Sequence, residues 1–196
     1  MLMFTLLSAA LASPPPDVGV DWEVYTTSPV LVECATVNGA PWCRSQGTIL
    51  APVAGVVTAL KDMRHNADQF ASVVKIDILP EDTLRVVLDY PAPLDDRDYV
   101  ARYVYTQQGD QHFFRWTPVP NAAPQEAGVV RLPEFAGEWR LTPTTEGHTQ
   151  VRYTWQAAIH GSFPSWAYAT AWKRAGYEAL HDLAGTQGAP LAPPAP

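Results

Sequence analysis

Apolar residues along this chain follow two different spacings. Alternation of apolar and polar residues, typical of half-buried strands, fills most of the body. Spacing of three to four residues, typical of an amphipathic helix, occurs in two segments, 51–70 and 164–184. The first repeats at Val53, Val56, Val57, Leu60 and Met63, and the second at Trp166, Ala169, Thr170, Tyr177, Leu180 and Leu183. Two helices therefore interrupt and end a chain built mainly of strands.

The clearest alternation runs over residues 150–160. One face carries Val151, Tyr153, Trp155, Ala157 and Ile159, and the other is largely polar. Such a strand has one face against a core and one face in water. Similar segments are found at 22–25, 30–37, 40–50, 74–78, 84–90, 99–105, 113–118, 129–132 and 139–142. The order predicts an α+β fold in which a twisted antiparallel sheet carries the C-terminal helix on its concave side.

A tight hairpin is predicted around Asn38-Gly39, the strongest signal for a two-residue turn. If Val37 pairs with Ala40, then Cys34 lies opposite Cys43 in a non-hydrogen-bonded pair, where side chains approach most closely. A cross-strand disulfide is sterically allowed there. The alternative is a pair of buried free cysteines, which behave as small apolar residues.

The two ends differ from the body. Residues 1–16 begin with a short apolar run, contain Ala10-Leu11-Ala12 in the form of a signal-peptidase site, and end in three prolines. We interpret them as a signal peptide and leader, although no Lys or Arg precedes the apolar run. The domain is then 17–184, and the Pro/Ala-rich tail 185–196 is expected to be disordered. The protein would be exported, periplasmic or extracellular, and cytoplasmic if the first segment is not a signal.

Composition narrows the classes of function. Hydrophobic residues make up 47% of the 196 residues, which is enough for a sizeable core and excludes global disorder. The net charge of -7 disfavours nucleic acid as a partner, because neutralising phosphate supplies most of that affinity. No apolar run reaches the roughly 18 residues of a membrane span.

Two motifs resemble those of START domains, the StAR-related lipid-transfer family. Residues 90–100 (YPAPLDDRDYV) resemble the signature P-x-P-L-x-x-R-D-F-V, and residues 161–166 (GSFPSW) resemble the G-x-I-P-x-W that precedes the family's C-terminal helix. Between them, Gly137-Glu138-Trp139 and 147–159 fall in the family's order. The resemblance covers Trp22 to Leu183. It implies a helix-grip fold of the wider Bet v 1-like/SRPBCC superfamily, with an apolar tunnel between a curved sheet and the last helix.

The resemblance turns aromatic residues on the inferred inner faces into candidates for the tunnel wall. They are Tyr103, Trp139, Tyr153, Trp155, Ile159 and Trp166. The alternative is that these side chains simply fill a core. Arg97 and Asp98 are the charged residues of the motif. One interpretation is that they contact the polar head of a ligand. The interpretation that we favour is that they stabilise the start of a strand, with Arg97 pairing locally.

The sequence contains no catalytic constellation that we recognise. The five histidines are scattered without metal-ligand spacing, and neither a nucleophile elbow nor a phosphate-binding loop occurs. We therefore expect a monomer without catalytic activity, metal or cofactor that binds a lipid or other apolar small molecule and touches membranes transiently. The sequence leaves open whether it transfers this ligand or only binds it. The alternatives are an enzyme of the superfamily, such as a polyketide-type cyclase, and an interaction module without a ligand.

Overall fold

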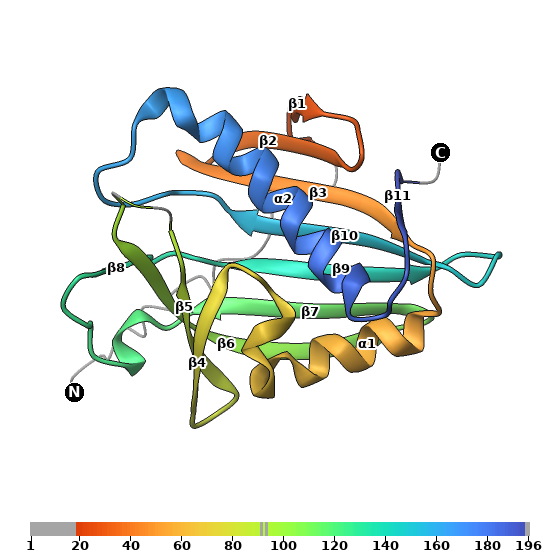
Figure 1. Cartoon of the computed structure of the whole chain (residues 1–196), viewed down its shortest axis with the longest axis horizontal. Helices are drawn as coiled ribbons and strands as arrows, with labels where there is room; N and C mark the ends of the chain where they lie inside the picture. The colour runs from red at the N-terminus through yellow and green to blue at the C-terminus, as the bar shows by residue number, and fades with distance from the viewer. Residues whose placement is uncertain (1–18, 91, 93, 195–196) are drawn as a thin grey trace, which may run out of the picture.

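The structure is a computed structural model, and it describes residues 19–90, 92 and 94–194. The predicted signal peptide and leader, 1–16, lie outside these residues. The body is one curved sheet, antiparallel except for a single parallel pair, with a long C-terminal helix lying across it (Figure 1). The α+β helix-grip architecture expected from the sequence is confirmed.

Eleven strands form the sheet. Their main order is β1-β2-β3-β10-β9-β7-β6-β5-β4; β11 pairs with β3, and β8 pairs in parallel with β6. The strands are β1 (Glu23–Thr26), β2 (Leu31–Val37), β3 (Ala40–Ile49), β4 (Val73–Leu79), β5 (Thr83–Leu88), β6 (Asp96–Gln108), β7 (Gln111–Pro118), β8 (Val129–Arg131), β9 (Gly137–Pro143), β10 (Thr149–Gln156) and β11 (Leu191–Ala192).

The β2–β3 hairpin has the predicted register. Val37 lies opposite Ala40, and Cys34 lies opposite Cys43. The two cysteines form a disulfide with a Cα–Cα distance of 4.0 Å. Asn38 and Gly39 both have positive φ, as a type I′ turn requires. The Asn38-Gly39 turn was therefore enough to predict this register.

The helices are shorter than their apolar patterns suggested. α1 (Val53–Asp62) ends eight residues before Phe70, and two 3₁₀ turns, η1 (Met63–His65) and η2 (Ala67–Gln69), complete the segment. Asn66 breaks the helical geometry between them, with φ of -140°. The C-terminal helix α2 (Tyr168–Gly185) is preceded by a 3₁₀ turn, η4 (Ser165–Ala167), and a further turn, η3 (Pro120–Ala122), follows β7. Among the described residues, none forms a helix long and apolar enough to cross a membrane.

Two expectations were wrong: where the strand before α2 ends, and what the C-terminal tail does. The strand predicted for 150–160 stops at Gln156, so Ile159 and His160 belong to the loop before α2. The tail was expected to be disordered, yet Leu191–Ala192 form β11 against β3, and the Leu50 amide donates a hydrogen bond to the Pro190 carbonyl oxygen. The reason is space: the Leu191 side chain packs over Gly47, which has no side chain of its own to block it.

The sheet separates an apolar face from a polar face. Its concave face packs against α1 and α2 through Ile49, Leu141, Val151 and Leu180, all of which are fully buried. α2 comes closest at Gly176, where an added Cβ would lie 3.0 Å from Val32 and 3.1 Å from Ser45. The convex face carries ion pairs instead, such as Glu33–Arg44 at 2.7 Å and Glu138–Arg115 at 2.6 Å. Any apolar binding site therefore belongs to the concave side.

Candidate functional site

A continuous stack of aromatic rings covers the centre of the concave face. We call Tyr103, Trp116, Trp139, Tyr153 and Trp155 the aromatic wall; they come from β6, β7, β9 and β10. Tyr153 stands in the middle, with ring centroids 4.2 Å from Trp139, 4.8 Å from Trp155 and 5.8 Å from Trp116. Cross-strand pairing places these residues together, because Tyr153 lies opposite Trp139 and Tyr103 lies opposite Trp116. Four of the six predicted wall residues thus meet.

The tyrosines of this region are neutral phenols held in an apolar setting. The Tyr99 and Tyr103 hydroxyls form a 2.8 Å hydrogen bond to each other. Burial raises the pKa of Tyr99, Tyr103 and Tyr153 well above the usual tyrosine value. Tyr103 and Tyr153 nevertheless remain only half-buried and pack at the margin of the core. Their hydroxyls therefore stay protonated across the physiological pH range and act as hydrogen-bond donors.

Trp116 is the wall residue that the sequence analysis did not single out. It is 2% exposed and stacks between Tyr103 and Tyr153. Its ring lies against Gly137, where an added Cβ would come within 2.1 Å of the indole. The alternation of 113–118 placed it on the same face as Phe114. It comes beside Tyr153 only through the pairing of β7 with β9 and of β9 with β10, so no local pattern in the sequence singles it out.

Two predicted wall residues lie elsewhere. Trp166 is 84% exposed, in η4, so its assignment to the wall is corrected. Ile159 lies in the loop before α2, where its carbonyl oxygen accepts a hydrogen bond from the Tyr168 hydroxyl. The aromatic residue that α2 turns toward the core is Trp172, whose Nε1 donates to the Ala157 carbonyl oxygen at 3.0 Å. The 3₁₀ turn changes the helical phase, which the helical pattern could not reveal.

Arg97 ties the two sequence motifs together. It is 1% exposed, and its guanidinium donates hydrogen bonds to the carbonyl oxygens of Asp95 and His160. The guanidinium also lies 4.4 Å from the centre of the Tyr90 ring. Among the described residues it has no carboxylate partner within ion-pair distance. The structural role favoured from the sequence agrees with this geometry, except that its long-range partner is the loop before α2.

Asp98 points to the opposite face of β6 from Arg97. It is fully buried and accepts hydrogen bonds from Arg85 at 2.6 Å and from Arg131 at 2.6 and 2.9 Å. These two guanidinium groups hold the pKa of Asp98 below the usual aspartate value, although its burial alone would raise it. Asp98 is therefore part of a buried ion cluster that joins β5, β6 and β8, and it does not face the aromatic wall.

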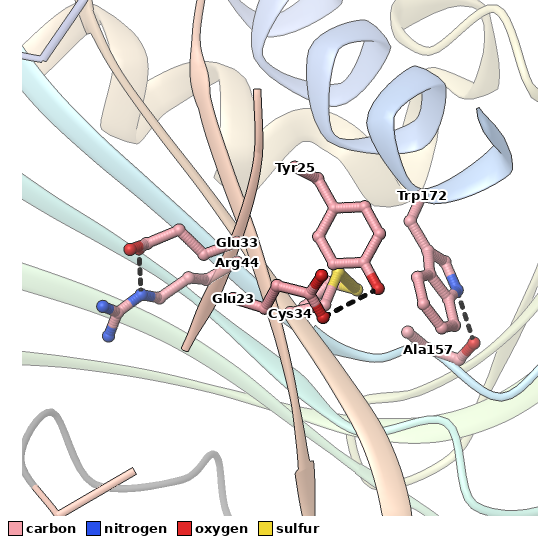
Figure 2. The surroundings of a disulfide bond; sticks show 8 residues. Glu23, Tyr25, Glu33, Cys34, Arg44, Ala157 and Trp172 are labelled. Carbon is pink, nitrogen blue, oxygen red and sulfur yellow. Dashed lines mark hydrogen bonds and ion pairs between the residues drawn. A yellow bond between two sulfur atoms is a disulfide. The ribbon is translucent and has the colours of Figure 1, made fainter. Parts of the chain in front are cut away.

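Two open clefts indent the surface outside the wall. One, of about 440 Å³, lies beside β8 and is lined by Asp95, Val130 and Arg131 among others. The other, of about 490 Å³, lies beside the disulfide and is lined by Asp21, Glu23, Tyr25, Cys34 and Trp172 among others. Figure 2 shows Tyr25 and Trp172 next to each other there, beneath α2. Tyr103, Trp139 and Tyr153 line neither cleft. Within the described part of the chain, no group of three or more His, Cys, Asp or Glu residues is arranged to hold a metal ion.

Comparisons with known proteins identify the fold. No family profile matches the chain. An uncharacterized protein of Pseudomonas aeruginosa is 26% identical over 175 residues, which cover 85% of this chain and 87% of that protein. Solved structures are similar throughout the domain. A STAR-related lipid transfer protein from Xanthomonas axonopodis has a TM-score of 0.73 and 24% identity, covering 84% of this chain and 97% of the other.

More distant structures extend the similarity. Human STARD10 has a TM-score of 0.73 and 15% identity, covering 91% of this chain and 82% of the other. The ZhuI aromatase/cyclase of a Streptomyces species has a TM-score of 0.51 and 18% identity, covering 74% of this chain and 91% of the other. The chain therefore has the fold of START domains, as the two motifs implied, and this fold also occurs in an enzyme.

Proposed function

We propose, from the premise that this chain has the helix-grip fold of START domains, that it is a START-domain protein that binds an apolar small molecule, a lipid. The ligand would lie between the aromatic wall and α2. Two of the similar structures, the Xanthomonas axonopodis protein and the human StAR-related lipid transfer protein 5, are lipid transfer proteins by name, which supports this class of ligand.

The observation that carries the proposal is the partial burial of the Tyr103 and Tyr153 side chains. Both are surrounded closely enough that burial raises their pKa, yet both keep accessible side-chain surface. These two side chains are enclosed by protein but keep solvent-accessible surface, and an internal ligand would cover that surface. A filled core, the alternative, would leave the central ring of the stack as buried as its neighbours Trp139 and Trp155, which are 5% and 4% exposed.

The energetics of a lipid require no catalysis. Each buried methylene contributes about 0.8 kcal/mol, so a chain of about sixteen carbons gains roughly 12 kcal/mol on leaving water. A bilayer offers nearly the same gain, so a carrier has only to match it with an apolar site and a few polar groups. The wall supplies rings and neutral tyrosine hydroxyls of this kind. We therefore propose binding, with transfer between membranes as its use, and no chemical step.

A cyclase is the second candidate, because the fold is shared with ZhuI and because two tyrosine hydroxyls meet at 2.8 Å inside this one. A cyclase would consume a ligand, whereas a carrier releases it unchanged. Recovering the ligand after incubation and comparing its mass before and after separates the two functions.

The disulfide and the exposed Trp166 support two further parts of the proposal. Disulfides such as that between Cys34 and Cys43 form and persist in oxidising compartments, which favours an exported protein. Trp166 lies in a turn with Phe163 and Pro164 nearby, and the 31 residues from Gly147 to Tyr177 contain no Asp or Glu. An exposed tryptophan in a stretch of sequence free of acidic residues suits the interface of a membrane.

Native mass spectrometry of the protein, exported and purified without detergent, tests the proposal. We expect a bound mass of lipid size, and uptake of lipid from vesicles by protein stripped of it. Tyr153→Ala should weaken uptake, whereas Tyr177→Ala, on an exposed part of α2, should not. Protein that carries no ligand and takes none from vesicles would contradict the proposal and favour an interaction module.

A further inference from the structure

The aromatic wall presents hydrogen-bond donors that the protein does not use. The Trp116 indole N–H is buried without a hydrogen-bond partner. No hydrogen bond joins the Tyr153 hydroxyl to another described group, and the Tyr99–Tyr103 pair uses only one of its two hydroxyl hydrogens. Because burial raises the pKa of all three tyrosines, these hydroxyls keep their protons. An indole N–H can only donate, so this group needs an acceptor from outside.

Charged groups are scarce on the same face. On β6, Arg97 shares the face of Tyr99 and Tyr103 but lies at the start of the strand, six residues before Tyr103. Two of its guanidinium nitrogens donate to the carbonyl oxygens of Asp95 and His160, its Nε is buried without a partner, and the group lies over the Tyr90 ring. At the other end of β6, Lys61 lies over the exposed Tyr105 ring.

The carboxylates next to the wall point away from it. Asp98 on β6 and Glu138 on β9 face the convex side and are paired with arginines there. The centre of the wall is therefore apolar, neutral and rich in donors.

A neutral wall that is rich in hydrogen-bond donors limits which head group a ligand can carry. A carboxylate or phosphate placed there would leave water without a free cation beside it, at a cost of several kcal/mol. An oxygen that carries no charge would instead accept a hydrogen bond from the Trp116 indole N–H, which is otherwise buried without a partner. We infer that the ligand of the aromatic wall has a neutral, oxygen-bearing head that accepts hydrogen bonds, such as a hydroxyl, ketone or ester, and not an anionic one.

This inference rests on the proposed function, and matched probes test the two separately. The first pair is methyl palmitate and palmitate, and the second is a sterol and its sulfate ester; each pair shares one apolar body and differs in the charge of its head. Binding is measured at pH 8 by quenching of tryptophan fluorescence. We expect each neutral probe to bind at least about tenfold more tightly than its anionic partner, which corresponds to roughly 1.4 kcal/mol.

Two conservative variants locate the head. Tyr153→Phe removes one donor and keeps the ring, and Trp116→Phe removes one donor and leaves a smaller aromatic ring. Each should weaken the neutral probes about fivefold, the effect of one hydrogen bond. Hexadecane, which has no acceptor, should bind both variants as it binds the native protein. Tyr105→Phe is the matched control, because that hydroxyl bonds His112 at the exposed end of the sheet.

The outcomes are distinct. Preference for the anionic probes, lost in Arg97→Gln, would overturn the inference while leaving the proposed function intact, since an apolar body would still be bound. Equal binding of charged and neutral probes would also overturn it. Failure of every probe, hexadecane included, would contradict the proposed function itself.

Discussion

At the scale of single residues, neighbours in sequence do different work because they face opposite sides of the sheet. Arg97 points to the concave side and holds the loop before α2, whereas Asp98 points to the convex side into a cluster with Arg85 and Arg131. The two charged residues of the motif look like a pair in sequence, but they make separate interactions on opposite faces of the sheet. The alternation of side chains along β6 is the physical reason.

The Asp98 cluster predicts a specific loss of stability in acid. Because its pKa is lowered in the folded protein, Asp98 contributes stability that is fully present above its unfolded pKa of about 3.9 and is lost as the pH falls through the lower folded value. Asp98→Asn should cost roughly 3–5 kcal/mol at pH 7, the usual cost of breaking a buried pair, and its difference from the native protein should shrink below about pH 4.

Urea unfolding at pH 7 and pH 3 measures this effect. Asp77→Asn is the control, since Asp77 contacts the same Arg85 at 3.3 Å but is partly exposed, and it should cost less than about 1 kcal/mol. A difference between Asp98→Asn and the native protein that is equal at both pH values would contradict the prediction.

Gly137 is the residue whose side chain is missing for a reason of packing. A Cβ there would lie 2.1 Å from the Trp116 ring and 2.4 Å from the Thr154 carbonyl oxygen. We expect Gly137→Ala to destabilise the fold by about 1–3 kcal/mol, as overpacking does, and to weaken ligand binding by displacing Trp116. Chemical denaturation should show no such loss for Gly185→Ala, where nothing lies within 4 Å of the added Cβ.

At the scale of elements, the β2–β3 hairpin is a locally determined unit and α2 is not. Turn residues, register and disulfide all follow from residues within a short stretch of sequence. α2 depends on distant partners: Gly176 fits against Val32, Ser45 and Trp155, and Trp172 bonds the Ala157 carbonyl oxygen. The buried residues of α2 all lie in its later part, at Gly176, Leu180, Leu183 and Ala184.

The disulfide should stabilise the hairpin without defining it. The two cysteines are nine residues apart, and closing a loop of that length is worth about 2–3 kcal/mol on the chain-entropy account. We expect the double variant Cys34→Ala/Cys43→Ala to lose about that much and to keep its fold by circular dichroism. A reductant should lower the melting temperature of the native protein and leave the double variant unchanged; a variant that fails to fold would show that the turn alone is insufficient.

At the scale of the whole molecule, the protein is acidic, with a net charge of -7, but presents an exposed tryptophan in a stretch free of acidic residues. Contact with a membrane would then rest on aromatic insertion and gain little from anionic lipid. The open clefts, the aromatic wall and Trp166 lie in different parts of the fold, so they can be altered one at a time.

Trp166→Ala tests the membrane contact. Because the side chain is 84% exposed, its loss should change the free energy of unfolding by less than about 0.5 kcal/mol. Co-sedimentation with neutral vesicles should fall, and adding anionic lipid should not restore it. Arg174→Ala, which removes an exposed charge nearby on α2, serves as the control and should sediment as the native protein does. Unchanged sedimentation of Trp166→Ala would place the contact elsewhere.

The sequence by itself determined the features that depend on short spacings. Alternation located most of the strands in the order in which they occur, and the Asn38-Gly39 turn placed Cys34 opposite Cys43. The two motifs led to the helix-grip fold. Four wall residues, Tyr103, Trp139, Tyr153 and Trp155, followed from their strand faces together with the resemblance to START domains. Neighbours along the chain, a fixed period of two and short motifs carried this information.

Only the tertiary structure decided which faces meet. It brought Trp116 into the wall through the pairing of β7 with β9 and turned Trp166 out through a 3₁₀ turn. It paired Leu191 with the end of β3 beyond the last residue paired with β2, where its side chain packs over Gly47. It also gave Arg97 a partner in the loop before α2, 63 residues away. These outcomes depend on space left between elements that are distant in sequence, and no local pattern of apolar and polar residues records that space.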